Sequence, residues 1–336
     1  MTHPPDRPHR RRPRRTVGLL LSAILAALSL LFGAIPANAL TPVPPTQPGT
    51  YKVGTYEFLY WTGGPGFQNA RVSYPATSNG WLKPADKTEG KYPIVALAPA
   101  SWVGFDYFDW AISYLTSHGY IVLSYYPPNL LSTDPYMHTK NIKAAITKLI
   151  SENGAWGSPV RGIVDTGKIA AAGVSLGGAG ALTAAAQDSR IDAVVAMTPG
   201  YDPADPDTYN RVEADVRNIR VPTLIESGQN DCISPGAGKR YYNDISGTYK
   251  QYVEIGGANH VQFLDDQGVS VPIPGVPQDC TPGVSYDSQH YTANVYATAF
   301  LEYFLKGRTQ FGTYLNGAYA QADRASGVLS DLLFQP

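Results

Sequence analysis

Short apolar runs alternate with longer amphipathic segments over most of the chain. The runs that predict strands cover residues 51–61, 69–74, 92–97, 120–125, 168–173, 193–197, 222–225 and 251–255. The segments that predict helices cover residues 107–117, 137–151, 176–186 and 291–305, and the C-terminal residues keep some helical pattern. Because strands that alternate with helices form parallel sheets, we predict an α/β fold. We expect a mostly parallel central sheet with helices on both faces and the first two strands as an antiparallel edge.

The first 39 residues have the pattern of an export signal. A group of arginines precedes an apolar run from Val17 to Ile35, and Ala37-Asn38-Ala39 is a small-x-small cleavage site. The pattern predicts secretion, and the paired arginines partly match the twin-arginine signal. The alternative is an uncleaved membrane anchor, because the run approaches the length of a spanning helix. Cleavage after Ala39 is favoured and would leave no stable membrane span.

The expected organisation is a signal peptide (residues 1–39), a Pro-rich linker (40–50) and a single domain (51–336). Removal of residues 1–39 takes away six arginines and one aspartate, so 20 basic and 26 acidic residues remain. The formal net charge then changes from −1 to −6. An acidic protein without a basic stripe is a poor candidate for nucleic-acid binding. We expect a monomer with a neutral or apolar substrate.

The segment Gly173-Val174-Ser175-Leu176-Gly177 fits the pattern G-x-S-x-G. The pattern is common by chance, but here a strand of small apolar residues precedes it and a Gly/Ala-rich helix follows. This context is typical of the nucleophile elbow of an α/β-hydrolase fold, where two glycines let the backbone turn sharply. The helix N-terminus would also stabilise developing negative charge. We predict Ser175 as a nucleophile; the alternative is an ordinary strand–helix turn.

A serine hydroxyl needs a general base, and the chain order in α/β-hydrolases is Ser, acid, His. His118 and His138 precede Ser175 and do not fit this order. His260 directly follows the strand at 251–255, in G-G-A-N-H, and is the preferred base. The alternative base is His290, at the start of the last predicted helix, where a capping or surface role is expected.

The preferred acid is Asp231, which follows the strand at 222–225 in E-S-G-Q-N-D. It would orient the imidazole and stabilise its charged form. The alternatives are Glu226, within the strand, and three aspartates of a Pro-rich loop that fit turn positions better: Asp202, Asp205 and Asp207.

Two N–H groups must stabilise the oxyanion that forms when the serine attacks. One is expected from Leu176, the residue after the nucleophile. The other is expected from the loop after the strand at 92–97, where Ser101 is preferred and Ala100 or Trp102 are alternatives.

The chain has two cysteines, Cys232 and Cys280. An even count in an exported chain favours a disulfide, and two free thiols are the alternative. Four prolines between Leu264 and Gln289 exclude a regular helix or central strand there. We interpret this stretch as an ordered loop beside the active cleft, with a surface insertion of no role as the alternative.

Four segments resemble the bacterial cutinase-like polyester hydrolases and triacylglycerol lipases, including PET-degrading enzymes, within the wider dienelactone-hydrolase-like set. They are A-P-A-S-W ahead of S-H-G-Y-I-V, then G-V-S-L-G-G-A-G-A, V-P-T-L-I-E-S-G-Q-N-D-C-I-S-P and K-Q-Y-V-E-I-G-G-A-N-H. The resemblance implies a catalytic α/β-hydrolase domain with Ser175, Asp231 and His260 as the triad. It also implies oxyanion donors at Ser101 and Leu176.

The same resemblance implies that Trp102 and Tyr201 contact the substrate, since the family has aromatic residues in the oxyanion loop and after the sixth strand. The chain departs from the family at Val174, where an aromatic residue or histidine is usual, and at Ser101, where the loop aromatic is usual. A Cys232–Cys280 bridge would pin the long loop to the acid-bearing loop.

These observations predict a secreted serine carboxylic ester hydrolase, cutinase- or lipase-like, that acts through an acyl-enzyme. One alternative is an esterase for acetylated polysaccharide or small soluble esters. Another is a non-catalytic binding protein with this fold, although all three triad positions are filled. No cofactor or metal is expected, because C-x-x-C, H-E-x-x-H and G-K-[ST] are absent from the sequence.

Overall fold

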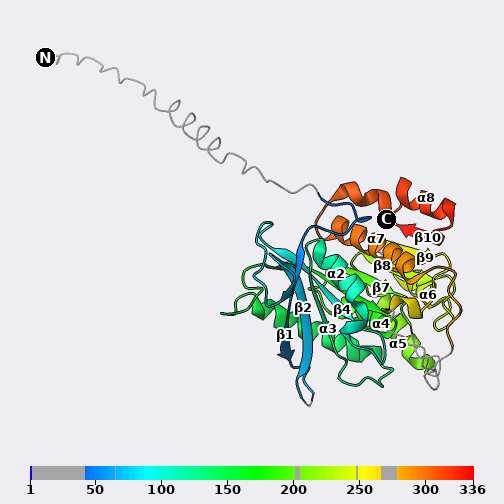
Figure 1. Ribbon diagram of the computed structural model, residues 1–336, viewed down its shortest axis with the longest axis horizontal. Coiled ribbons are helices and arrows are strands. Elements are labelled where there is room, and N and C mark those ends of the chain that lie inside the picture. The colour runs from blue at the N-terminus through cyan, green and yellow to red at the C-terminus, as the bar shows by residue number, and fades with distance from the viewer. Residues whose placement is uncertain (2–41, 65, 201–204, 247–248, 266–277) are drawn as a thin grey trace. The chain divides into compact units, whose positions relative to one another are not determined.

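The computed structural model describes Met1 and residues 42–64, 66–200, 205–246, 249–265 and 278–336, and Val43–Pro336 forms one compact unit. Its centre is a ten-stranded sheet with the strand order β10-β9-β8-β7-β6-β4-β5-β2-β1-β3 (Figure 1). The strands are β1 (Lys52–Tyr60), β2 (Gln68–Ala76), β3 (Gly80–Trp81), β4 (Tyr92–Ala98), β5 (Ile121–Tyr125), β6 (Val164–Val174), β7 (Ala193–Met197), β8 (Thr223–Gly228), β9 (Lys250–Ile255) and β10 (Leu329–Gln335).

The six strands from β4 to β9 all run parallel to one another. At one end β2 pairs antiparallel with β5 and with β1, and at the other end β10 pairs antiparallel with β9. The predicted α/β fold with a mostly parallel sheet is confirmed, as is the antiparallel pair of opening strands.

Helices cover both faces of the sheet (Figure 1). One layer contains α2 (Asp109–Ser117) and α7 (Tyr286–Phe304), and the opposite layer contains α3 (Pro135–Glu152), α4 (Leu176–Gln187), α5 (Pro206–Val216) and α6 (Ala237–Asp244). After α7 come a 3-10 turn at Thr309–Tyr314, the helix α8 (Ala318–Ser326) and β10.

Small residues let α4 lie very close to its neighbours. A Cβ atom on Gly180 would stand 2.5 Å from the His138 Cβ and 2.9 Å from the Pro135 carbonyl oxygen, both in α3. Only a glycine fits such a contact without moving α3. The Gly/Ala-rich composition of this segment, predicted as a packed helix, is therefore a requirement of the α3–α4 contact.

The helices α5 and α6 and the strand β10 were not predicted, each for a different reason. The Asp205 side chain caps α5 by accepting the Thr208 N–H at 3.2 Å, and Pro206 occupies the first turn, so a segment interpreted as a turn begins a helix. The helix α6 is short and polar, and it buries Tyr241 on one side. The strand β10 depends on pairing with β9, which lies far away in sequence.

The described part of the segment predicted as a linker packs on the end of α2. The Tyr114 hydroxyl donates to the Pro45 carbonyl at 2.6 Å, the Gly49 N–H donates to the Ser117 Oγ at 2.8 Å, and the His118 Nε2 lies 2.8 Å from the Gln47 carbonyl. The predicted signal peptide, residues 1–39, lies outside the described residues apart from Met1. The division at residues 39 and 50 stays a prediction.

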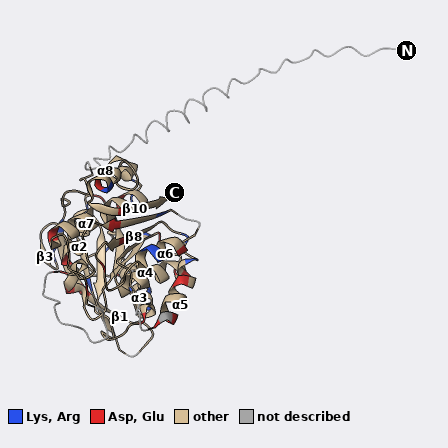
Figure 2. Ribbon diagram, turned by 90° about the vertical axis from the view of Figure 1, so that its right-hand side faces the viewer, with Lys and Arg blue, Asp and Glu red and all other residues tan. Residues whose placement is uncertain are grey.

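Charged positions of both signs are spread over several elements, including α5 and α6 (Figure 2). Among the residues that the structure describes, none of the helices combines the length and the apolar character needed to cross a bilayer.

Candidate active site

The carboxyl ends of three parallel strands bring Ser175, Asp231 and His260 together. Ser175 follows β6, Asp231 follows β8 after two residues, and His260 lies in the turn after β9. The loops after β8 and β9 are also joined to each other, because the Asn230 N–H donates to the Ala258 carbonyl at 2.7 Å. The three residues therefore lie together at the carboxyl edge of the sheet.

Ser175 has a backbone conformation that is rare for a residue with a side chain, with φ 56° and ψ −123°. The residues two positions before and two positions after it permit the turn because they are glycines. A Cβ on Gly173 would lie 2.2 Å from the Gly177 carbonyl oxygen, and a Cβ on Gly177 would lie 2.3 Å from the Pro99 carbonyl oxygen. The result is the strained strand–helix turn that the motif predicts, with the serine at the N-terminus of α4.

A line of hydrogen bonds joins the three side chains. The His260 Nε2 lies 2.9 Å from the Ser175 Oγ, and the His260 Nδ1 lies 2.9 Å from the Asp231 Oδ2. The His260 and Asp231 side chains are only 8% and 6% exposed. A carboxylate on Nδ1 favours the tautomer with the proton there, which leaves Nε2 free to accept the serine proton. The geometry therefore suits proton transfer from Ser175.

Asp231 is held as a carboxylate by several donors. Its Oδ1 accepts the N–H groups of Ile233 at 3.0 Å and Ser234 at 2.8 Å, and its Oδ2 accepts the Thr198 hydroxyl. Burial by itself raises the pKa of Asp231, but the charge and hydrogen bond of His260, with the Ser234 and Thr198 donors, outweigh it and leave the pKa below its ordinary value. The group therefore stays ionised at neutral pH.

Thr198 is a residue of this site that the sequence interpretation missed. Its hydroxyl lies 3.2 Å from the His260 Nδ1 in addition to bonding Asp231, and its φ of 40° is rare for a β-branched residue. The one available signal is its position, because it is a polar residue directly after β7, at the same edge as the acid and the base.

The two predicted oxyanion donors lie on neighbouring segments. Leu176 is the first residue of α4, where N–H groups have no carbonyl partner within the helix. The loop after β4 reaches the same place, as the close approach of Pro99 to Gly177 shows. The Ser101 N–H makes no hydrogen bond with any residue that the structure describes, whereas the Trp102 N–H donates to the Leu130 carbonyl at 3.2 Å. Of these two amides, only that of Ser101 is unused.

Of the predicted substrate contacts, Trp102 is half-buried in this loop with a φ of 65°, and Tyr201 lies outside the described residues. The glycine before it, Gly200, is described and lies against Ser175. A Cβ on Gly200 would be 3.2 Å from the Ser175 Oγ and 2.6 Å from the Ser234 Oγ. The missing side chain leaves room beside the serine hydroxyl.

Replacing Gly200 by alanine is expected to lower kcat/KM for p-nitrophenyl esters by about 10- to 100-fold, because the methyl group displaces the acyl carbon from Ser175. The φ of Gly200 is not left-handed, so alanine needs no strained backbone. Steady-state kinetics over acyl chains of increasing bulk should show a growing loss. Gly154→Ala, whose Cβ would meet nothing closer than 3.9 Å, is the matched control. Equal rates for Gly200→Ala and the wild type would contradict this account.

The other candidate residues have other partners. His138 is buried, and its Nδ1 lies 3.1 Å from the Tyr125 hydroxyl oxygen. Burial lowers the pKa of His138 to about 3. His290 was expected to cap α7 or lie at the surface, and this is wrong. It is half-buried, stacks on Trp110 at 4.2 Å and lies 2.7 Å from the Gln262 carbonyl, while Ser285 caps the helix. Burial raises the pKa of Glu226 well above its usual range, so it is a poor carboxylate for His260.

Cys232 and Cys280 are bonded to each other, with Cα atoms 5.3 Å apart. The predicted loop between Leu264 and Gln289 is described at its two ends only, since residues 266–277 lie outside the described residues. Its last four residues belong to α7, which begins at Tyr286, so the predicted end of the loop was wrong by one helical turn. The reason is the Ser285 cap, which starts the helix earlier than the apolar pattern suggests.

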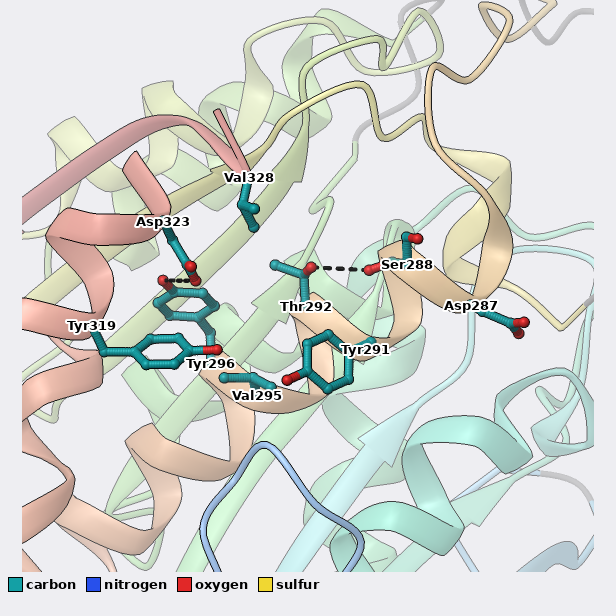
Figure 3. Close-up of a pocket in the computed structure, with 9 residues that line it drawn as sticks. All are labelled: Asp287, Ser288, Tyr291, Thr292, Val295, Tyr296, Tyr319, Asp323 and Val328. Atoms are coloured by element: carbon teal, nitrogen blue, oxygen red, sulfur yellow. Dashed lines mark hydrogen bonds between the residues drawn. The ribbon is translucent and has the colours of Figure 1, made fainter. Parts of the chain in front are cut away.

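A separate cavity of about 410 Å³ lies between α7 and α8 (Figure 3). Tyrosine rings and two carboxylates form its wall, and the Tyr296 hydroxyl donates to Asp323 at 2.9 Å. Ser175, His260 and Asp231 do not line this cavity. Within the described part of the chain, no cluster of three or more histidine, cysteine, aspartate or glutamate residues could hold a metal.

A serine on a strained turn between a strand and a helix, with a histidine and a carboxylate at the carboxyl ends of later parallel strands, defines the α/β-hydrolase class. Within that class, a family model described as PETase: PET hydrolase-like matches residues 47–270, and the chain belongs to this family.

Several characterised relatives are similar to this chain. Cutinase est1 of Thermobifida alba is 27% identical over 264 residues, which cover 74% of this chain and 80% of that protein. Cutinase cut1 of Thermobifida fusca is 26% identical over 262 residues, 74% of this chain and 73% of the relative. A bis(hydroxyethyl) terephthalate hydrolase of Streptomyces coelicolor is 26% identical over 198 residues, 58% and 56% of the two chains. The family and these relatives identify the protein as a cutinase-like carboxylic ester hydrolase.

Proposed function

We propose that the protein is a secreted serine hydrolase that cleaves carboxylic esters through an acyl-enzyme, with Ser175 as nucleophile, His260 as general base and acid, and Asp231 as the orienting carboxylate. The observation that carries the proposal is the unbroken line from the Ser175 Oγ through His260 to Asp231, with 2.9 Å at each of its two steps. The apolar run and Ala-x-Ala site of residues 17–39 support export and cleavage after Ala39.

The geometry supports the following proposed reaction. His260 Nε2 takes the proton of Ser175 as its Oγ attacks the ester carbonyl, and the carbonyl oxygen becomes an oxyanion held by the N–H groups of Leu176 and Ser101. His260 then gives the proton to the leaving alcohol. Water enters, loses a proton to His260 and attacks the acyl-enzyme, which releases the acid and restores Ser175.

For the substrate we propose apolar polyesters or aromatic diesters, because the relatives are named for cutin and for bis(hydroxyethyl) terephthalate. Gly200 supports a bulky acyl group, since it leaves the side of Ser175 open. Hydrolysis of bis(hydroxyethyl) terephthalate and of a polyester film should be compared with hydrolysis of p-nitrophenyl acetate. Activity confined to acetate esters would favour the small-ester alternative.

The triad itself is tested by covalent labelling with diethyl p-nitrophenyl phosphate. We expect one equivalent of p-nitrophenolate to be released with loss of activity, and peptide mass spectrometry should place the diethylphosphoryl group on Ser175. Label on another residue, or full ester hydrolysis after complete labelling of Ser175, would refute the assignment.

A further inference from the structure

A short segment, Asp279–Thr281, lies between the loop that carries Asp231 and the loop that carries His260. It comes from the C-terminal part of the long insertion before α7, far from both loops in sequence. It contacts the residue before and the residue after each member of the Asp231–His260 pair, and we refer to it as the splint.

On the C-terminal side of the pair, one carboxylate bridges the two loops. The Asp279 Oδ1 accepts the N–H of Cys232, the residue after Asp231, at 3.0 Å. The Asp279 Oδ2 accepts the N–H of Val261, the residue after His260, at 2.8 Å. Hydrogen bonds to a charged acceptor are about twice as strong as neutral ones. The two oxygens therefore fix the separation of the two loops.

On the N-terminal side, two asparagines repeat the arrangement. The Asn230 Nδ2, on the residue before Asp231, donates to the Thr281 carbonyl at 3.1 Å. The Asn259 Nδ2, on the residue before His260, donates to the Cys280 carbonyl at 2.9 Å. The residues directly before and after Asp231 and His260 thus all hydrogen-bond to the splint.

The splint is itself anchored at its central residue and just beyond its C-terminal end. The disulfide joins Cys280 to Cys232, and the Cys280 N–H donates to the Asp279 Oδ1 at 2.9 Å, which orients the carboxylate. Two residues beyond the splint, the Gly283 N–H donates to the Gly257 carbonyl at 2.7 Å. The carboxylate is therefore presented from a fixed backbone rather than from a free loop.

We propose that Asp279 is a positioning residue that sets the His260–Asp231 geometry from outside the reacting groups. The proposal rests on the triad role given above to that pair. Proton transfer needs the imidazole to stay within hydrogen-bond reach of both partners, and a shift of about 1 Å can cost about 100-fold in rate. Asp279 acts on kcat through this geometry and makes no contact with the ester.

The test compares Asp279→Ala and Asp279→Asn with the wild type. Alanine removes both acceptors, so kcat for p-nitrophenyl butyrate should fall about 100-fold with KM changed less than about twofold. Asparagine keeps one acceptor oxygen, so the kcat of Asp279→Asn should lie between those of Asp279→Ala and the wild type. The rate of Ser175 labelling by diethyl p-nitrophenyl phosphate should decrease in the same order. Asp287→Asn, which removes an exposed carboxylate of α7, controls for the lost charge and should react as the wild type does.

Several outcomes would overturn the proposal. These are an unchanged kcat in both Asp279 variants, a loss that matches only their unfolded fraction by circular dichroism, or an equal loss in Asp287→Asn. If Asp279→Ala does not fold, the comparison of Asp279→Asn with Asp287→Asn decides alone. Ser175 labelling in the wild type separates the two levels of inference. If Ser175 is labelled normally and the Asp279 variants are unaffected, the positioning role of Asp279 is refuted and the triad assignment stands. If another residue is labelled, the triad assignment is refuted.

Discussion

Replacing Ser175 by alanine is expected to lower kcat for p-nitrophenyl butyrate by about 10⁶-fold, the size of loss seen when the nucleophile of a Ser-His-Asp triad is removed. His260 has no proton to take without the hydroxyl, and no acyl-enzyme can form. The oxyanion donors remain in place, so a residual acceleration of about 10³- to 10⁴-fold over water should persist. Progress curves at high enzyme concentration, with active-site titration, measure both quantities.

The matched control for this variant is Ser151→Ala, an exposed serine in the last turn of α3, whose hydroxyl only donates to the Lys148 carbonyl. It should keep wild-type kinetics. Thermal unfolding should show that Ser175→Ala is folded, because alanine differs from serine by one atom. A wild-type kcat for Ser175→Ala would refute the assignment of Ser175 as the nucleophile.

The second large effect is expected for Asp231→Asn, with a loss in kcat of about 10⁴-fold. The asparagine oxygen can still accept the N–H groups of Ile233 and Ser234, so the loop should keep its shape. Its NH₂ then faces the His260 Nδ1, which favours the tautomer that places the ring proton on Nε2. Nε2 can no longer accept from Ser175, and catalysis fails although the site is intact. Asp207→Asn is the control, and a comparable loss there would redirect the search for the acid.

The same variant has a pH signature in stability. Since the folded-state pKa of Asp231 lies below its ordinary value of 3.8, its carboxylate stabilises the fold above that pH. This contribution is lost as the pH falls through the folded-state pKa. We therefore expect the Tm difference between wild type and Asp231→Asn to shrink in acid below about pH 4, as measured by thermal unfolding across pH.

Local signals account for what the sequence could predict. The strands β4 and β7 and the second half of β6 are continuous buried runs of apolar or small residues, and the glycines around Ser175 serve a turn that only a few residues can form. Asp231 and His260 were chosen as candidate acid and base because each follows a strand that a short apolar run reveals. Their contact, however, depends on which strands are neighbours in the sheet. The strand order β6-β7-β8-β9 places β8 and β9 side by side.

What the sequence could not predict depends on tertiary contacts. Thr198 gains its role from a left-handed backbone and a hydroxyl aimed at a carboxylate from another strand. Asp279 lies 48 residues after Asp231 in a Pro-rich stretch, where no periodicity or spacing marks it as a bridge. The strand β10 has no regular alternation of apolar and polar residues, and only its pairing with β9 defines it.

One edge of the sheet bears on how the protein behaves at high local concentration. The edge strand β10 has a bulge between Leu329 and Asp331, and Asp331 forms an ion pair with Lys239 at 2.7 Å. Bulged and charged edges are poor templates for strand pairing between molecules. Crowded molecules should therefore resist joining their sheets through β10.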